Sequence, residues 1–433
     1  MTLTNEMESA MELIENTDKN IFITGKAGTG KTTFLKHLIT HLTKKAIVSA
    51  PTGVAAINAG GVTLHSLLSI PIGILDPDRA ISSGFSPWRV KLLQTIDILI
   101  IDEISMVRPD IIDYVDKKLK MYRHNYKPFG GVQIVMFGDL YQLPPVVTNE
   151  EKAGLYNLYD GAYFFYSRVF LTHGFQIVEF NEIFRQKDNQ FKEILNHIRT
   201  YNMTSRDIEC LGELRDRKGA NIYSNKFIHI CSHRKDVVDI NKRLLGKATH
   251  SFKAQLSGKF KITSAPCDER LDIRKGARIM MLVNDKEHNY YNGSLGIINS
   301  IDQQGISVTL DSGKDILVNE YIWESYDYTT KNGKVVKKVV GSCRQYPIAL
   351  AWAITIHKSQ GLTFDNIAIH TRGVFCPGQI YVALSRCTSL SGIVSDSFID
   401  ERYIIPDEHL IAFEKAYKKN DYLFNAETYK LMN

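Results

Sequence analysis

Mostly apolar runs of four to six residues recur through the first third of the chain, and stretches with helical spacing separate them. The runs occupy residues 21–24, 46–50, 96–101 and 132–137. An uninterrupted apolar run of this length is typical of a strand buried on both faces, as in a parallel sheet covered by helices. Between the first two runs, one side of a predicted helix carries Phe34, Leu35, Leu38 and Leu42. The pattern therefore predicts an α/β fold, with a parallel sheet and helices on both of its faces.

A second α/β unit is predicted to begin at the apolar run 177–180. It continues through a helical stretch at 191–199 and a strand at 227–231. The residues after Pro406 have helical spacing, and we expect those helices to pack on this second unit.

Between Ser251 and Arg344 the pattern changes to short strands separated by turn signals. These signals are Gly276, Asn292-Gly293, Gly305, Ser312-Gly313 and Asn332-Gly333. Glycine after a polar residue between short apolar runs is typical of a β-hairpin. Because the α/β pattern returns at Tyr346, we interpret the segment as a small β-barrel inserted into the second unit.

Two local patterns each have two interpretations. The aromatic cluster at residues 156–170 resembles a nucleic-acid stacking platform, but such clusters more commonly pack a core or a domain junction, which we favour here. The basic run at residues 331–338, KNGKVVKK, would suit a polyanion. A solvated hairpin explains it more simply.

Composition narrows the class of protein further. The 433-residue chain is long enough for several domains, and its 44% hydrophobic and 23% charged residues are ordinary for a soluble globular protein. A net charge of +6 is compatible with a polyanionic partner. The six scattered cysteines form no C-x-x-C pair, which argues against a zinc site and favours a reducing compartment. With no membrane-length apolar run and an acidic, helix-like N-terminus, the sequence predicts an intracellular protein without a targeting signal.

The strongest chemical signal is a glycine-rich loop directly after the first apolar run. Residues 25–32, GKAGTGKT, fit the pattern G-x-x-x-x-G-K-[ST] between a predicted strand and a predicted helix. Inward-facing N–H groups of such a loop and the positive end of the helix bind the phosphates of a nucleoside triphosphate. Lys31 would reach the β- and γ-phosphates, and the hydroxyl of Thr32 would bind Mg²⁺. The predicted nucleotide-binding residues are Gly25, Gly28, Thr29, Gly30, Lys31, Thr32 and Thr33.

Polar residues follow two other predicted strands, at the edge where open α/β sheets bind ligands. Asp102 and Glu103 come after the strand at 96–101, and Gln142 follows the strand at 132–137. Asp102 would hold Mg²⁺ through water, and Glu103 would orient or deprotonate the attacking water. Gln142 is a candidate sensor of the γ-phosphate, although, taken alone, a turn at a strand end is the better explanation.

Two arginines far along the chain are candidates for transition-state stabilisation. Arg185 lies in Phe184-Arg185-Gln186, and Arg386 ends the run YVALSR at residues 381–386. An arginine that faces the γ-phosphate stabilises its developing charge and couples ATP binding to domain closure. A lone arginine is more commonly a surface residue, so only the surrounding sequence singles these two out.

These segments together resemble the superfamily 1 helicases of the Pif1 group over nearly the whole chain. The resembling segments are GKAGTGKT (25–32), APTGVAA (50–56), TLHS (63–66), IIDEISMV (100–107), FGGVQIVMFGDLYQLPPV (129–146), IFRQ (183–186), AITIHKSQGLTFD (353–365) and GQIYVALSR (378–386). The resemblance implies two RecA-like P-loop NTPase domains, with ATP between them and single-stranded DNA crossing both. It places the first domain at 1–63 and 80–176, a wedge element at 64–79, the second domain at 177–250 and 346–433, and an SH3-like barrel at 251–345.

The resemblance also implies which residues act. Gln360 would join Arg185 and Arg386 at the γ-phosphate. The implied DNA-binding residues are Pro51, Thr52, Thr63, His65, Thr355, His357 and Lys358. Small hydroxyl and histidine side chains suit gripping of phosphates without reading bases. One departure is Met7, which stands where related helicases carry a glutamine that reads adenine, so the sequence does not predict selectivity for ATP over other nucleotides.

The expected function is that of an ATP-dependent DNA helicase that moves 5′ to 3′ on single-stranded DNA. Its expected role is genome maintenance, including DNA repair and telomere-type or G-quadruplex processing. We expect binding to single-stranded DNA and to junctions with duplex, no membrane partner, a monomer in the absence of DNA, and a cytoplasmic bacterial or phage-encoded protein. The alternatives are a RecD2-type or phage Dda-type superfamily 1 helicase, and an ATP-switched DNA-binding protein that does not unwind.

Overall fold

The computed structural model describes residues 3–432 with short gaps and divides into two compact units. The gaps are residues 72, 80–86, 187, 217–225, 286, 288, 291, 332 and 333, and the side chains of residues 327–337 are also outside the described part. The first unit comprises Met1–Phe184, Tyr326–Val339 and Asp407–Asn433. The second comprises Arg185–Ser325 and Val340–Pro406.

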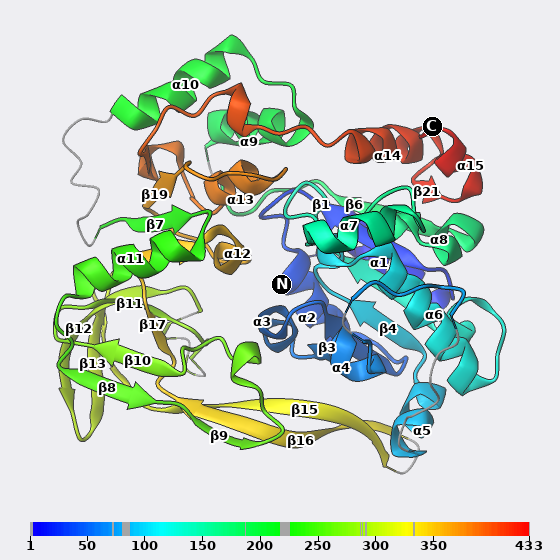
Figure 1. Ribbon diagram of the computed structural model, residues 1–433, viewed down its shortest axis with the longest axis horizontal. Helices are drawn as coiled ribbons and strands as arrows, with labels where there is room; N and C mark the ends of the chain where they lie inside the picture. Colours follow the sequence, from blue (N-terminus) through cyan, green and yellow to red (C-terminus); the bar gives the residue numbers. More distant parts are fainter. Residues whose placement is uncertain are drawn as a thin grey trace. The chain divides into compact units, whose positions relative to one another are not determined.

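The first unit is built on a seven-stranded sheet with the order β21-β6-β1-β5-β4-β2-β3 (Figure 1). Its strands are β1 (Ile21–Gly25), β2 (Ala46–Ala50), β3 (Val62–Thr63), β4 (Ile98–Ile101), β5 (Gln133–Phe137), β6 (Phe175–Phe180) and β21 (Leu423–Phe424). Neighbouring strands run parallel, except that β21 is antiparallel to β6. The four apolar runs at the start of the chain are therefore confirmed as buried parallel strands.

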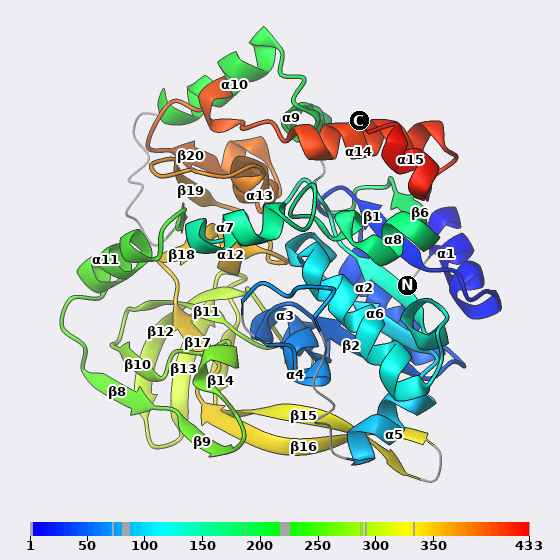
Figure 2. The same ribbon diagram turned by 45° about the vertical axis from the view of Figure 1, so that its right-hand side comes forward.

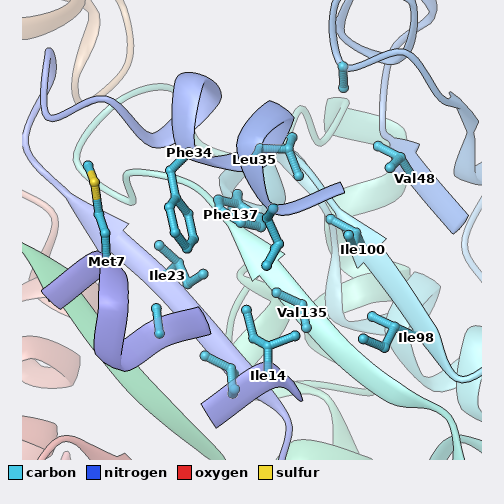
Figure 3. Close-up of a cluster of buried hydrophobic side chains, with 14 of the residues drawn as sticks. Met7, Ile14, Ile23, Phe34, Leu35, Val48, Ile98, Ile100, Val135 and Phe137 are labelled. Carbon is cyan, nitrogen blue, oxygen red and sulfur yellow. The ribbon is translucent and has the colours of Figure 1, made fainter. Parts of the chain in front are cut away.

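Helices cover this sheet and complete its core. They are α1 (Asn5–Asn16), α2 (Lys31–His41), α3 (Gly53–Asn58), α4 (Leu64–Leu68), α5 (Pro87–Thr95), α6 (Pro109–Arg123), α7 (Asn149–Tyr156), α8 (Arg168–His173), α14 (Glu408–Lys419) and α15 (Ala426–Lys430). Figure 3 shows how side chains of α1 and α2 meet those of β1 and β5 in one buried cluster. Phe34 of α2 packs on Phe137 of β5 with ring centroids 6.1 Å apart, which fixes the helix after the glycine loop against the sheet.

Strand β6 corrects the predicted start of the second unit. The run at 177–180 lies in the first sheet, where Ile23 of β1 pairs with Val178. The second unit begins only at Arg185. An apolar run shows that a strand is buried but not which sheet it joins, so the predicted boundary at residue 177 is wrong.

The C-terminal helices also pack elsewhere than predicted. Both α14 and α15 belong to the first unit, beside α8 and β21 (Figures 1 and 2). Phe165 stacks on Phe413 of α14 with ring centroids 4.2 Å apart. The aromatic cluster at 156–170 is thus part of the core, as favoured from the sequence, and it provides the apolar surface that the C-terminal helices cover.

The second unit contains a smaller, four-stranded parallel sheet with the order β18-β7-β19-β20. Its strands are β7 (Ile228–Cys231), β18 (Ala353–Thr355), β19 (Ile367–His370) and β20 (Ile393–Ser395). The helices of this unit are α9 (Asn189–Thr200), α10 (Ser205–Asp216), α11 (Arg234–Leu245), α12 (Ile356–Ser359) and α13 (Gln379–Ser385). Two parallel sheets with helices confirm the α/β class.

Antiparallel strands occupy most of the segment between α11 and β18, as the turn signals predicted. They are β8 (His250–Lys253), β9 (Gln255–Gly258), β10 (Arg270–Ile273), β11 (Arg278–Met281), β12 (Leu295–Asp302), β13 (Gly305–Leu310), β14 (Asp315–Val318), β15 (Tyr321–Lys331), β16 (Lys334–Gln345) and β17 (Ile348–Leu350). Five of them form the sheet β14-β13-β12-β11-β17. Since β17 pairs with β11, the inserted region extends past its predicted end at residue 345. The chain changes sheets there, because β16 pairs with β9.

None of the described helices is long and apolar enough to cross a bilayer. The basic run at 331–338 lies almost entirely outside the described residues and side chains.

Candidate active site

The glycine loop adopts a backbone that its sequence anticipates. Gly25, Gly28 and Gly30 have φ angles of 148°, 85° and 82°, a region in which side chains with a Cβ are strained. At Gly25 a Cβ would also lie 2.5 Å from the carbonyl oxygen of Phe180 on the neighbouring strand. The loop can therefore turn sharply from β1 into α2 only with glycine at these positions.

Lys31, the first residue of α2, folds back over the loop. Its Nζ donates to the carbonyl oxygen of Gly25 at 2.7 Å and to that of Lys26 at 3.0 Å. Thr29, which is buried, donates its hydroxyl to the same carbonyl of Lys26 at 3.0 Å. Thr32 and Thr33 are exposed in the first turn of α2, at the positive end of the helix dipole. The loop thus gathers one ammonium group and exposed hydroxyls at a helix N-terminus, which is the donor set a triphosphate requires.

The two predicted acids follow β4 at the same edge of the sheet. The Asp102 N–H donates to the Ser49 carbonyl oxygen at 2.9 Å, and the Asp102 carboxylate accepts the N–H of Glu103 at 3.0 Å. Burial raises the pKa of Asp102 to about 6, against the opposing effect of the nearby Lys31 and Lys36 ammonium groups. A partly buried carboxylate whose ionisation is disfavoured in this way is a suitable ligand for a cation, whose charge would offset the cost of desolvation.

Gln142 is held by the acid at the end of β5. Its Nε2 donates to Asp139 Oδ2 at 3.2 Å, while the Tyr141 N–H donates to Asp139 Oδ1 at 3.2 Å. Strand β5 lies between β1 and β4. The structure therefore brings Lys31, Asp102 and Gln142 to the carboxyl ends of three adjacent parallel strands.

The predicted arginines of the second unit meet around one residue, Ser385. Arg185 Nη1 donates to the Ser385 carbonyl oxygen at 3.1 Å, and Arg386 Nη2 donates to Ser385 Oγ at 2.9 Å. Arg386 is almost fully buried, and its Nη1 lies 3.5 Å from the carbonyl oxygen of Ser359. Burial lowers the pKa of Arg185.

Gln360 follows Ser359 and completes this cluster. Its Nε2 is buried and has no hydrogen-bond partner among the residues that the structure describes. A buried amide in this state is ready to donate to an acceptor on a ligand. The approach of Arg185, Gln360 and Arg386 to the γ-phosphate stays a prediction.

The predicted DNA-binding residues of the first unit lie after β2 and β3. Thr52 caps α3 by accepting the Ala55 N–H at 3.2 Å, and Thr63 caps α4 by accepting the Ser66 N–H at 3.2 Å. Pro51 is partly exposed beside Thr52. Burial lowers the pKa of His65, with Arg108 acting in the same direction.

The second unit repeats this arrangement after β18. Thr355 caps α12 by accepting the Lys358 N–H at 3.1 Å. Burial lowers the pKa of His357, and Lys358 is exposed. In both units a threonine thus ends a parallel strand and begins a short helix, so the predicted residues share one local geometry. Their contact with DNA stays a prediction.

Phe184 is a residue of the site that the sequence pattern does not predict, although Arg185 beside it is predicted. Phe184 is 52% exposed although it lies against the glycine loop. Its N–H donates to the Gly28 carbonyl oxygen at 2.9 Å, and its ring lies 3.7 Å from the position a Cβ would take at Gly30. An exposed aromatic face beside a phosphate loop suits stacking against a nucleobase. The position directly before Arg185 was the signal that could have identified it.

Met7 is a core residue. Its side chain is fully buried in the cluster of Phe34 and Ile23 (Figure 3), and its Cε lies 3.4 Å from the position of a Cβ on Gly30. It supports the loop from inside, so it is not placed to read the edge of a base.

The glycine loop, the strand-end acids and the glutamine at one edge of a parallel sheet define a P-loop nucleoside triphosphatase. Comparison with known proteins gives the family. The family model described as PIF1-like helicase matches residues 2–209. The chain belongs to the PIF1-like helicase family, as its resemblance to the Pif1 group predicted, and it is an ATP-driven helicase by class.

Individual relatives support this assignment over the whole chain. The crystal structure of Bacteroides sp Pif1 in complex with ADP-AlF4 is 52% identical, covers 98% of this chain and 99% of that one, and superposes with a TM-score of 0.94. A structure of Bacteroides Pif1 bound to ssDNA has a TM-score of 0.73. The ATP-dependent DNA helicase Pif1 of Campylobacter jejuni is 31% identical over 93% of this chain and 95% of its own length. The chain matches 63% of the length of the Danio rerio helicase PIF1, also at 31% identity.

Proposed function

We propose that this chain hydrolyses ATP to move 5′ to 3′ along single-stranded DNA and unwinds duplex or structured DNA during genome maintenance. The observation that carries the proposal is the meeting of Lys31, Asp102 and Gln142 at one sheet edge. Membership of the PIF1-like helicase family supports the coupling of that site to DNA. The direction of movement rests on the family resemblance alone.

In the proposed reaction, Lys31 and the N-terminus of α2 bind the β- and γ-phosphates of ATP. Thr32 and Asp102 would hold Mg²⁺, which neutralises charge on the phosphates when bound. Glu103 follows Asp102 directly and has a φ of 52°, a left-handed backbone that turns the chain at the strand end. We assign Glu103 the role of orienting the attacking water, and Gln142 that of detecting the γ-phosphate.

The second unit would supply positive charge to the transition state. Arg185 and Arg386 share Ser385 as a hydrogen-bond partner, so both guanidinium groups are held in fixed positions. Gln360 adds an amide that no described residue satisfies. Preorganised donors of this kind stabilise charge that develops during phosphoryl transfer.

Single-stranded DNA would be gripped through its phosphates. Four residues of the first unit and three of the second form the proposed contact set, which is Pro51, Thr52, Thr63, His65, Thr355, His357 and Lys358. Their shared position at strand ends supports binding of the phosphates without reading the bases.

We further propose that residues 64–79 act as a wedge and that the inserted β region is an SH3-like barrel. The protein would act at junctions with duplex, as a monomer before DNA binds, in a bacterial or phage-infected cytoplasm.

Duplexes with a single-stranded tail test this function directly. We expect unwinding of a duplex with a 5′ tail, dependent on ATP and Mg²⁺, and little unwinding with a 3′ tail. Lys31→Ala should abolish hydrolysis and unwinding, whereas Lys19→Ala, which removes an exposed ammonium group, should change neither. Preference for the 3′ tail would overturn the direction, and hydrolysis without unwinding would favour an ATP-switched DNA-binding protein. A G-quadruplex placed after the 5′ tail tests the structured substrate.

A further inference from the structure

The carboxyl edge of the second unit's sheet carries an exposed aromatic pair that no part of the proposed function uses. His233 follows β7, and Phe375 lies in the loop after β19. Their rings are stacked, with centroids 5.6 Å apart and an interplanar angle of 15°. Phe375 is nevertheless 60% exposed, so one face of its ring packs on His233 while much of the rest contacts solvent.

The loop that presents Phe375 is shaped around this pair. Gly373 has a φ of 74°, and a Cβ there would lie 2.2 Å from His233 Nε2. The Phe375 N–H donates to Oε1 of the fully buried Gln379 at 2.9 Å, which anchors the loop to α13. The exposed ring is therefore held in place by its backbone and by His233, and is not a side chain at the tip of an unsupported loop.

The charges around the pair favour a polyanion. Arg234 and Lys235 at the start of α11 and Arg372 in the β19 loop are all exposed. Two acids, Asp236 and Asp396, also lie near this edge, since both act electrostatically on the Cys231 thiol at the end of β7. The carboxylate of Asp396 is engaged by the His370 ring at 2.9 Å and by the Thr371 N–H at 3.2 Å. Basic residues around an exposed aromatic face are the composition of a single-strand binding surface.

The pair lies on the same sheet edge as the proposed phosphate grip at Thr355. In the parallel register, Thr355 at the end of β18 pairs with Cys231, and His370 at the end of β19 pairs with the same residue. Adjacent strands are about 4.8 Å apart, so the ends of β18 and β19 are separated by about 10 Å. One nucleic-acid strand held at Thr355–Lys358 can therefore also reach the loops of His233 and Phe375.

We propose that Phe375, backed by His233, is a stacking platform for an unpaired base of the single strand bound at the Thr355–Lys358 loop. The proposal rests on the proposed function, because it assigns the base contact that accompanies that loop's phosphate contacts. An aromatic ring accepts any base, so the platform adds affinity without sequence preference. It differs from the aromatic cluster at 156–170, whose rings from Tyr159 to Phe170 are buried in the core of the first unit.

Two labelled oligomers of equal length and charge test the proposal with the full chain, by fluorescence polarisation. One is oligo-dT and the other has the same backbone without bases. Phe375→Ala should weaken oligo-dT binding about tenfold and leave binding of the abasic oligomer unchanged. Its salt dependence should match that of the wild type, since no charge is lost. Phe375→Trp should retain wild-type affinity, and Tyr126→Ala, which removes a 95% exposed ring from the first unit, should change nothing.

A second variant acts on the support of the platform. Gly373→Ala places a methyl group where His233 now lies, so it should displace the histidine and weaken oligo-dT binding by a smaller factor. The platform is refuted if Phe375→Ala binds oligo-dT as the wild type does, or if it weakens both oligomers equally. A wild-type protein that binds neither oligomer would refute the proposed function itself, and the platform with it.

Discussion

Tyr141 donates its hydroxyl to the carboxylate of Glu414, a residue 273 positions later in the chain. Tyr141 directly precedes Gln142, the proposed γ-phosphate sensor. Glu414 lies on α14 and also forms an ion pair with Lys418 one turn further on. The C-terminal helix therefore contacts the catalytic edge of the first unit, and the position of Gln142 depends on a segment far from the phosphate loop in sequence.

Glu414→Ala should lower both stability and turnover. Loss of one largely buried hydrogen bond to a charged acceptor costs about 1–3 kcal/mol of unfolding free energy. Because Tyr141 would lose its partner, we expect kcat for ATP hydrolysis to fall severalfold with a smaller change in KM. Urea unfolding and steady-state ATPase assays measure the two effects.

Glu427→Ala is the matched control, since it removes an exposed carboxylate from α15 in the same C-terminal segment. Tyr141→Phe should reproduce the loss of kcat while keeping the ring. If Glu414→Ala lowered stability but left kcat unchanged, the contact would be purely structural.

The fold class was predictable from sequence because the apolar runs are local signals. Each run marks a strand buried on both faces, and four of them were assigned correctly. The partner of a strand depends on contacts distant in sequence, so β6 and the C-terminal helices were assigned to the wrong unit. The Tyr141–Glu414 hydrogen bond also joins residues that are distant in sequence, so no local sequence pattern predicts it.

The candidate site was also predictable in part from the sequence. Lys31, Asp102 and Gln142 each follow a predicted strand, so the parallel order alone brings them together. Phe184 was missed because an exposed aromatic residue in a loop has no periodic signature. The His233–Phe375 pair was missed because its two residues follow different strands, β7 and β19, and meet only in the folded unit.

The raised pKa of Asp102 predicts a pH dependence of stability in the metal-free protein. Burial raises this pKa to about 6, so between about pH 4 and pH 6 the folded state binds a proton that the unfolded state has released. The free energy of unfolding therefore falls as pH rises through this window. Above pH 6 Asp102 is ionised in the folded state, and the whole destabilisation by its desolvated charge is present. Asp102→Asn should match the wild type below pH 4 and exceed its stability by on the order of 2 kcal/mol at pH 7.5.

Chemical unfolding of both proteins at several pH values, without Mg²⁺ or nucleotide, measures their free energies of unfolding. Asp97→Asn is the control, because that acid lies at the opposite end of the same strand and binds the Lys45 N–H at 2.8 Å. It removes a carboxylate next to the same strand, so it separates the effect of Asp102 from a general effect of lost negative charge. Equal stability of Asp102→Asn and wild type at pH 7.5 would contradict the assigned burial of the carboxylate.

Phe184 should contribute to nucleotide binding without selecting a base. Its exposed ring lies beside the glycine loop, whereas Met7 is buried and its thioether has no hydrogen to donate to a base edge. Phe184→Ala should raise KM for ATP and GTP by similar factors, about fivefold or more, and change kcat less. The wild type should use the two nucleotides with kcat/KM values within about tenfold of each other.

Steady-state hydrolysis assays with ATP and with GTP, in the presence of single-stranded DNA, measure these KM and kcat values. Phe184→Tyr should retain the wild-type KM, because it keeps the aromatic face. A loss confined to ATP would show that the ring takes part in adenine recognition.

Arg108 anchors part of the proposed wedge to the helices α6 and α7. Its Nε and Nη2 bind the two oxygens of the Asp110 carboxylate at 3.0 and 2.9 Å, and Nη2 also donates to the Gly73 carbonyl oxygen at 2.6 Å. Its Nη1 donates to Glu151 of α7 at 2.9 Å. Asp110 in turn accepts the Leu75 N–H at 3.0 Å. One guanidinium group thus links the start of α6, α7 and residues 73–75.

Arg108→Ala should therefore impair unwinding more than ATP hydrolysis. The change leaves the buried Asp110 carboxylate without its charged partner, which costs about 3 kcal/mol of stability and frees residues 73–75 from α6. Glu151→Gln, a milder change, should reduce unwinding by less and fold normally.

The control is Arg168→Ala, which breaks an exposed ion pair to Asp78 in the same segment and should cost at most about 1 kcal/mol of stability. Single-turnover unwinding of a tailed duplex, divided by DNA-stimulated ATPase rate, is the readout. A ratio that stays at the wild-type value in both Arg108→Ala and Glu151→Gln would show that residues 73–75 take no part in strand separation.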